Sequence, residues 1–160
     1  MLHLGLGGFF RAHQAWYTDQ APDAADWGIA AFTHRSTAIA DTLTAQQGLY
    51  TLVTRAADGD RFDIVGSVAA AHRVADHAAW LDYWRRPELA VVSLTVTEAG
   101  YTRVAGNGLD TALPAVQADI AALRADPEAE VATPAARLLA GLAARQRAGG
   151  APVAVVPCDN

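Results

Sequence analysis

The sequence predicts an α/β fold: a doubly wound, mostly parallel sheet with an inserted antiparallel hairpin. Three observations indicate this class. An apolar strand, a glycine turn and a helix start follow one another over residues 2–14. A second short apolar run, residues 27–33, comes after one helix-length segment and completes a β-α-β unit. Residues 89–96 form a continuous β-branched run, which is typical of strands buried on both faces of a parallel sheet.

Composition limits the possible partners and compartments. The chain has 160 residues, of which 52% are hydrophobic, so we expect one domain with its own core. A formal net charge of −5 and the lack of a basic run argue against nucleic acid or anionic membrane as a partner. Because no apolar run reaches the ~18 residues of a membrane span and no signal-peptide pattern follows Met1, we expect a cytoplasmic protein. The single cysteine, Cys158, excludes an internal disulfide, and the sequence contains no lysine.

The glycine turn is the first candidate site. Gly5 and Gly7 allow a tight turn and the close approach of another molecule, and the helix that follows would point its free amides at a pyrophosphate. A G-x-G-x-x-G pattern would place its third glycine where Phe10 stands. A strand-turn-helix corner without a ligand is therefore an equally open interpretation.

The first half of the chain predicts a helix, a strand, a second helix and a hairpin. The first helix spans residue 11 to about residue 20, since Pro22 bars its continuation. The second begins with Ser36 or Thr37 as its cap, and Gly48 suits the left-handed position after its end. Asp58-Gly59 between two β-rich runs, residues 49–55 and 61–68, predicts the hairpin.

The second half predicts three helices and two strands. Trp80 and Trp84 fall on adjoining turns of the first of these helices and are expected in the core. Leu138, Leu139 and Leu142 mark the apolar side of the last helix. The expected helices span residues 76–86, 114–125 and 134–148, and the expected strands span residues 89–96 and 152–156.

Polar residues directly follow the strand over residues 89–96. Ligands of open parallel sheets bind outside the carboxyl ends of the strands, so Thr95, Thr97 and Glu98 are candidates for contact with a cofactor or substrate. Glu98 could serve a proton path or position a substrate, or it could pair with an arginine such as Arg103. We predict no metal site, because His72 and His77 lack helical metal-ligand spacing.

Four stretches in order, residues 3–14, 47–50, 92–101 and 158–160, resemble the N-terminal half of the mannitol dehydrogenase family. These are polyol-specific long-chain dehydrogenases and reductases. The resemblance implies a Rossmann-type domain over residues 1–160 that binds NAD or NADP. In the family's common form, the turn carries an asparagine where Gly8 stands and a histidine where Phe10 stands.

The resemblance also implies an activity. The whole enzyme would transfer a hydride between nicotinamide and a sugar alcohol or ketose, with mannitol and fructose favoured and hexuronate reduction as the alternative. The family's general base is a lysine in a helical C-terminal domain, which we expect to be absent from this chain and to pack against it. Without lysine, this part alone should be inactive. Asn160 matches the family asparagine that stabilises the substrate oxygen.

The implied cofactor site draws on the turn and on the ends of two strands. Its residues are Gly5, Gly7, Gly8, Phe9, Phe10, Arg11, Arg35, Ser36, Thr95 and Thr97. The segment after the second strand lacks the acid that accepts a hydrogen bond from a ribose 2′-OH, and Arg35 with Ser36 could instead hold a 2′-phosphate. Arg35 as a solvated residue at a helix start is equally open.

Two other classes of function stay open. The chain could be an inactive, stand-alone nucleotide-binding or interaction module. It could also be a Rossmann-like domain that binds a nucleotide other than NAD(P).

Overall fold

The computed structural model describes residues 1–34, 37–104 and 108–159. The backbone divides into two compact units, one of Met1–Ala75 with Val92–Thr95 and one of Asp76–Val91 with Val96–Asn160. Among the described residues, no helix has the length and apolar character needed to cross a membrane.

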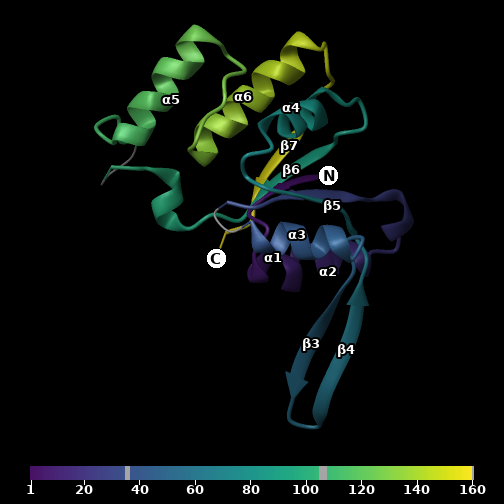
Figure 1. Cartoon of the computed structure of the whole chain (residues 1–160). Helices are drawn as coiled ribbons and strands as arrows, with labels where there is room; N and C mark the ends of the chain where they lie inside the picture. The colour runs from purple at the N-terminus through teal and green to yellow at the C-terminus, as the bar shows by residue number, and fades with distance from the viewer. Residues whose placement is uncertain (35–36, 105–107, 160) are drawn as a thin grey trace. The chain divides into compact units, whose positions relative to one another are not determined.

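A mostly parallel sheet organises the first unit (Figure 1). Its strand β1 (Leu2–Leu4) pairs in parallel with β2 (Ile29–Phe32) on one side and with β6 (Val91–Leu94) on the other, and β2 pairs in parallel with β5 (Val68–His72). With β7 (Ala154–Pro157), the strand order is β5-β2-β1-β6-β7. The predicted fold class is confirmed.

The central strands are buried on both faces, as parallel strands covered by helices must be. All residues of β1 and β2 are buried, and Leu6, Phe10, Leu43 and Val65 extend the same core. Strand β5 was missed by sequence analysis because its centre is Ala69-Ala70-Ala71, and alanine has low strand propensity.

The first predicted helix is split in two, so the prediction of one helix over residues 11–20 is wrong. Helix α1 (Gly8–Ala12) ends at His13, and α2 (Gln14–Asp19) begins directly after it; the short 3₁₀ helix η1 (Ala24–Asp26) follows. The Arg11 carbonyl oxygen, which a continuous helix would pair with the amide of residue 15, accepts instead from the Tyr50 hydroxyl at 2.6 Å. The Phe9 carbonyl lies 2.9 Å from Nδ1 of His13. Both contacts occupy backbone acceptors at the break.

Helix α3 (Ala38–Ala45) ends as the sequence predicts. Gly48 has φ of +83°, and its amide donates to the Leu43 carbonyl at 2.7 Å. Thr37 occupies the N-cap position without a capping hydrogen bond from its side chain. The other proposed cap, Ser36, lies outside the described residues.

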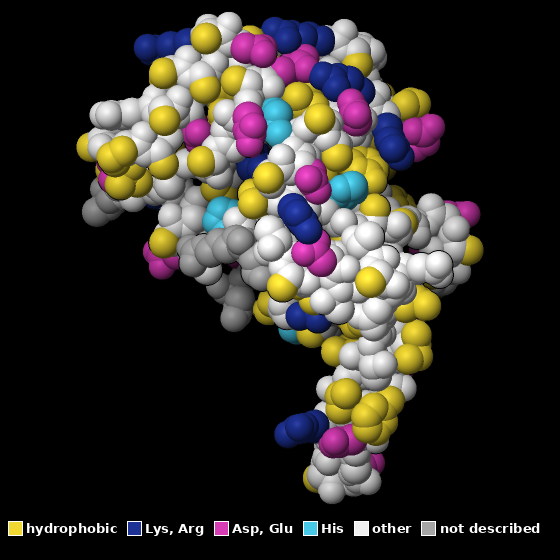
Figure 2. All heavy atoms as spheres, viewed as in Figure 1, with side chains coloured by type: hydrophobic (Ala, Val, Ile, Leu, Met, Phe, Trp, Pro, Cys, Tyr) yellow, Lys and Arg dark blue, Asp and Glu magenta, His cyan; other side chains and the backbone are white. Residues whose placement is uncertain are grey.

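The predicted hairpin is confirmed, and it forms a two-stranded sheet of its own. Strands β3 (Tyr50–Ala56) and β4 (Gly59–Val65) are antiparallel, with Arg55 opposite Asp60 next to the turn. The hairpin projects beyond helices α1–α3, and hydrophobic side chains line its surface (Figures 1 and 2). Val53, Phe62 and Ile64 are 43%, 67% and 65% exposed.

The second unit contains the predicted helices α4 (His77–Arg85), α5 (Pro114–Ala125) and α6 (Pro134–Arg147), and the short 3₁₀ helix η2 (Glu98–Tyr101). Prolines occupy the first positions of α5 and α6, where no intrahelical donor is needed. The buried carboxylate of Asp119 accepts from the amides of Ala132 and Thr133, 2.8 Å each, and so anchors the start of α6 to α5.

The buried face of α6 differs from the predicted one. Leu139 and Leu142 are 56% and 41% exposed, whereas Ala140 and Ala144 are fully buried. Trp80 and Trp84 of α4 fill the space on this side, and a Cβ on Gly141 would lie 2.2 Å from the indole of Trp84. Because the two indoles supply the volume, α6 needs small residues to approach α4.

Two buried arginines extend this packing. Arg145 donates to the backbone carbonyls of Trp84, Arg86, Leu89 and Ala151 at 2.6–3.1 Å. Arg137 lies 5.2 Å from the Trp80 ring centroid, as in a cation–π contact, and burial lowers the pKa of its guanidinium.

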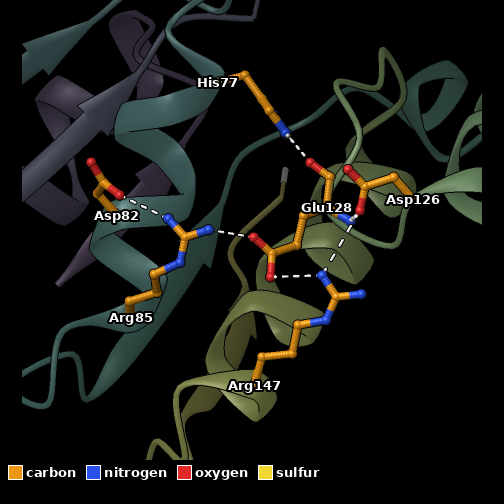
Figure 3. A network of polar contacts seen from close by, with 6 residues as sticks. All are labelled: His77, Asp82, Arg85, Asp126, Glu128 and Arg147. Atoms are coloured by element: carbon orange, nitrogen blue, oxygen red, sulfur yellow. Dashed lines mark hydrogen bonds and ion pairs between the residues drawn. The ribbon is translucent and has the colours of Figure 1, made fainter.

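A charged cluster links α4, the α5–α6 loop and α6 (Figure 3). The carboxylate of Glu128, 15% exposed, pairs with Arg85 and with Arg147, the latter at 3.0 Å. Arg85 also pairs with Asp82 at 2.8 Å. His77 Nε2 donates to the Glu128 backbone carbonyl at 2.9 Å, since a carbonyl oxygen can only accept.

Candidate functional site

The glycine turn lies at the carboxyl end of the central strand. Gly5, with φ of +120°, follows β1, and the amides of Gly5 and Leu6 both donate to the Phe32 carbonyl at the end of β2, 2.9 Å each. The Gly7 amide donates back to the Gly5 carbonyl at 2.6 Å. The turn is therefore held to the end of β2 by its own backbone.

Close approach to β6 explains why residue 5 is glycine. A Cβ at this position would lie 2.3 Å from the Thr95 carbonyl oxygen and 2.6 Å from Thr95 Oγ1. Gly8, in contrast, has no heavy atom within 4 Å of an added Cβ. The turn is thus tightly packed against the sheet at Gly5 and open at Gly8.

The turn occupies the position where open α/β sheets bind ligands. From β1 the sheet continues to β2 on one side and to β6 on the other, so the strand order reverses at β1. Such a switch point places a crevice outside the carboxyl ends of the two diverging strands. The turn after β1 and Thr95 after β6 meet there.

A cluster of three hydrogen-bonded polar side chains, those of His3, Ser93 and Thr95, lies beneath the turn. His3 Nδ1 is 2.8 Å from Ser93 Oγ, and His3 Nε2 is 3.1 Å from Thr95 Oγ1. Thr95 Oγ1 donates to the Gly5 carbonyl at 3.0 Å. The Phe10 ring stacks on the His3 imidazole, with a centroid separation of 3.8 Å and an interplanar angle of 16°.

The aromatic and basic residues predicted in the turn have different environments. Phe10 is fully buried in the core, so its backbone alone can meet a ligand. Phe9 is partly exposed and stacks on His13, with ring centroids 4.3 Å apart. Arg11 Nε donates to the Gly7 carbonyl at 3.2 Å, which ties its side chain to the turn.

Three predicted residues lie outside the described part of the chain: Arg35, Ser36 and Asn160. Thr33, which precedes the first two, is buried, and its Oγ1 accepts from the Val74 amide at 3.0 Å. Its hydroxyl therefore joins the end of β2 to the segment after β5.

In the second unit, Thr97 and Glu98 are exposed at the start of η2. Glu98, Tyr101, Thr102 and Arg103 line an open pocket of about 550 Å³ together with three apolar residues. This pocket brings the predicted Glu98 and its alternative partner Arg103 to the same surface, and the contact between them stays a prediction.

Asp159 organises the other side of η2. Its Oδ1 accepts from the Val96 amide at 2.7 Å, and its Oδ2 accepts from the Tyr101 hydroxyl. Burial, reinforced by this hydrogen bond and by the carboxylate charge, raises the pKa of Tyr101 to about 12. Asp159 thereby fixes the segment that carries Thr97 and Glu98.

Cys158 has a hydrogen-bond partner nearby in the chain. The Cys158 thiol donates to the Val156 carbonyl at 3.5 Å. Within residues 1–34, 37–104 and 108–159, no three His, Cys, Asp or Glu side chains are grouped to hold a metal ion.

Sequence reasoning assigned no role to His3, Ser93 or Asp159. Each of the first two interrupts an apolar strand with a polar side chain, and the pairing of β1 with β6 places His3 opposite Ser93. That interruption in two neighbouring strands is the available signal. Asp159 stands beside Asn160 in residues 158–160, one of the four stretches that resemble the family, and the sequence carries no further sign of its hydrogen bonds.

Comparison with known proteins gives a consistent set of matches. Residues 1–160 match the family model described as the mannitol dehydrogenase Rossmann domain. A mannitol 2-dehydrogenase of Cereibacter sphaeroides is 37% identical over 166 residues, which cover 100% of this chain and 34% of that protein. The D-mannonate oxidoreductase of Escherichia coli (strain K12) is 34% identical over 168 residues, again 100% of this chain and 34% of that protein.

A solved structure agrees in fold. It is described as the Pseudomonas fluorescens mannitol 2-dehydrogenase ternary complex with NAD and D-mannitol. It superposes with a TM-score of 0.86 at 33% identity, over 99% of this chain and 33% of that one. The chain thus spans about a third of the length of the relatives that it matches.

Proposed function

The chain belongs to the mannitol dehydrogenase family, and from this premise we propose that residues 1–160 form the NAD(P)-binding part of a polyol dehydrogenase. The observation that carries the proposal is the turn at Gly5–Gly8, placed at the switch point of the sheet. A solved relative is described as a complex with NAD and D-mannitol, which supports the choice of ligand.

The residues of the turn fit a dinucleotide. Glycine at positions 7 and 8 leaves the backbone accessible, since a Cβ on Gly8 would contact nothing and one on Gly7 would contact only the Gly5 carbonyl, at 3.6 Å. The first amides of a helix lack partners within it and can donate to phosphate oxygens. Here those amides belong to Gly8 and its neighbours, and Arg11 adds a positive charge.

The bound nicotinamide would supply the hydride acceptor and donor. The chain's own contribution is binding and orientation: the turn would hold the pyrophosphate, and Thr95 and Thr97, after β6, would line the cofactor. Asn160 would hold the substrate oxygen as charge develops on it. Glu98 would position the substrate or lie on a proton path.

The general base would come from a further, helical part of the polypeptide. Residues 1–160 contain no lysine, and the relatives extend over about three times this length. We propose that this further part packs against the present domain and supplies the lysine.

The substrate proposed first is a neutral polyol, mannitol with fructose as its product. The similarity to a mannitol 2-dehydrogenase supports this choice. Hexuronate reduction is the second candidate, supported by the similarity to a D-mannonate oxidoreductase.

The cofactor preference is a separate proposal. The segment Thr33-His34-Arg35-Ser36 contains no carboxylate for the ribose 2′-OH, so we propose that NADP is accepted. Dissociation constants of NADH and NADPH for the wild-type chain and Arg35→Asp test it. The wild-type chain should bind both, and the variant should lose affinity for NADPH more than for NADH. A strong wild-type preference for NADH would contradict the proposal.

Fluorescence titration with NADH tests the cofactor site itself. We expect saturable binding by the 160-residue chain, competed by ADP-ribose. Gly8→Leu should weaken it, because its side chain would fill the open side of the turn, while the unfolding midpoint stays near that of the wild type. If millimolar NADH and NADPH both fail to bind, the chain is a module with another role. If ADP-ribose binds far more tightly than either, it serves another nucleotide.

A further inference from the structure

The hydrogen bonds among His3, Ser93 and Thr95, beneath the glycine turn, run in a defined direction from donor to acceptor. The Gly5 carbonyl can only accept, so the hydroxyl proton of Thr95 points toward it across the 3.0 Å separation. A hydroxyl has one proton, and Thr95 Oγ1 therefore acts as acceptor toward His3. His3 Nε2, 3.1 Å away, must carry the proton that it donates to Thr95.

The other imidazole nitrogen completes the assignment. A neutral imidazole with its proton on Nε2 has a lone pair on Nδ1. Ser93 Oγ lies 2.8 Å from that nitrogen, and in this neutral tautomer it donates its hydroxyl proton to Nδ1. The four groups form a one-way chain, from the Ser93 hydroxyl through His3 and the Thr95 hydroxyl to the Gly5 carbonyl.

The surroundings hold the chain in place. His3, Ser93 and Phe10 are all fully buried, and the stacked Phe10 ring, 3.8 Å from the imidazole, keeps water from that face. Adjacent strands supply the donors and acceptors, because β1 and β6 pair in the register that places His3 opposite Ser93. Rotating the imidazole by half a turn about its Cβ–Cγ bond would put a ring carbon in place of each nitrogen and break both hydrogen bonds of the chain.

We propose that His3 is a positioning residue for the glycine turn, acting as a neutral imidazole with its proton on Nε2. The chain fixes the Gly5 carbonyl, which also accepts from the Gly7 amide at 2.6 Å. It thereby sets the orientation of the peptide groups between Gly5 and Gly7. The consequence for cofactor affinity rests on the proposed function, whereas the tautomer of His3 does not.

The tautomer can be measured on the intact 160-residue chain without any ligand. Long-range ¹⁵N spectra of histidine-labelled protein distinguish a protonated ring nitrogen from one with a lone pair. His3→Gln identifies the His3 signals among the five histidines of the chain. We expect a protonated Nε2 and an unprotonated Nδ1 at neutral pH. A proton on Nδ1, in either a neutral or a charged ring, would overturn the proposal.

A matched pair of variants tests positioning. Thr95→Val removes the hydroxyl at nearly constant volume, and Thr95→Ser retains it. We expect Thr95→Val to speed hydrogen exchange at the Gly7 amide and to weaken NADH binding about tenfold, the scale of one lost buried hydrogen bond. Thr95→Ser keeps the hydroxyl, so hydrogen exchange at its Gly7 amide should stay within about twofold of the wild-type rate.

Equal exchange rates at the Gly7 amide in the two variants would overturn the positioning role. If the wild-type chain binds no NADH while the ¹⁵N and exchange results are as expected, the proposed function fails and the role of His3 in the turn stands.

Discussion

Arg145 Nη1 donates to the Trp84 backbone carbonyl at 3.0 Å, one of four carbonyl acceptors that this buried guanidinium satisfies. The acceptors lie at the end of α4 and in the segments that follow α4 and α6. A cation near a helix C-terminus is stabilised by the helix dipole. Arg145 therefore joins three segments through their backbones, independently of their side chains.

Arg145→Lys should destabilise the protein by roughly 3 kcal/mol, because an ammonium cannot reproduce the planar fork and leaves buried carbonyls unpaired. Urea unfolding followed by circular dichroism measures the change. The control is Arg124→Lys, at an exposed position in the last turn of α5, which should change stability by less than about 0.5 kcal/mol. Equal effects of the two substitutions would contradict the assigned role.

Glu128→Gln should cost roughly 1 kcal/mol at low salt, because two arginines lose the carboxylate that they share. The loss should shrink as salt is added, since screening weakens the wild-type pairs as well. Asp82→Asn removes an exposed partner of Arg85 and should have almost no effect. A salt-independent loss for Glu128→Gln would show that packing, rather than charge, is responsible.

Tyr50 should make part of the stability depend on alkaline pH. Burial raises the pKa of its phenol from 10.0 to about 12; Arg11 opposes the shift and Asp19 adds to it. The folded state thus holds this proton more tightly than the unfolded state does. The stabilisation is fully present below pH 10 and is lost as pH rises toward about 12.

Tyr50→Phe removes both the titrating proton and the hydrogen bond to Arg11. Its unfolding free energy should be lower than that of the wild type near neutral pH, and the gap should narrow as the medium becomes strongly alkaline. Tyr17→Phe controls for removal of an exposed phenol. A constant gap across the alkaline range would refute the contribution of Tyr50 to the pH dependence.

Gly48→Ala should destabilise the protein by more than about 2 kcal/mol. An alanine is strained in the left-handed backbone conformation of this position, and its Cβ would also clash with a neighbouring backbone atom. The clash is with the Val68 carbonyl oxygen, 1.8 Å from the added atom. Gly149→Ala is a matched control, since φ is +67° and the added Cβ meets nothing within 4 Å. It should cost only about 1 kcal/mol of strain. Thermal unfolding of both variants measures the loss of stability, and the difference between them gives the cost of the clash beyond that of the left-handed strain.

Local signals predicted much of the fold. Apolar runs marked β1, β2 and β6, Asp58-Gly59 marked the hairpin turn, and prolines marked the starts of α5 and α6. Each of these signals acts through the backbone or through burial of adjacent residues. These elements can therefore be predicted without knowing which distant residues come into contact.

The features that sequence reasoning missed depend on contacts between distant residues. The break at His13 involves the hydroxyl of Tyr50, and the small buried face of α6 follows from the two indoles of α4. At the candidate site, Gly5 carries a local signal, whereas the roles of His3 and Ser93 follow only from the register of β1 against β6. Pairing registers between strands so far apart in sequence leave no local pattern.

Two tightly packed glycines, Gly5 and Gly48, face the same kind of obstacle. At each, the carbonyl oxygen of a neighbouring segment, from Thr95 or from Val68, occupies the space of a side chain. In evolutionary terms, purifying selection at both positions acts through folding, before any ligand is bound. Descendants that lost cofactor binding would keep both glycines, whereas Gly8, which has open space around it, would be free to diverge.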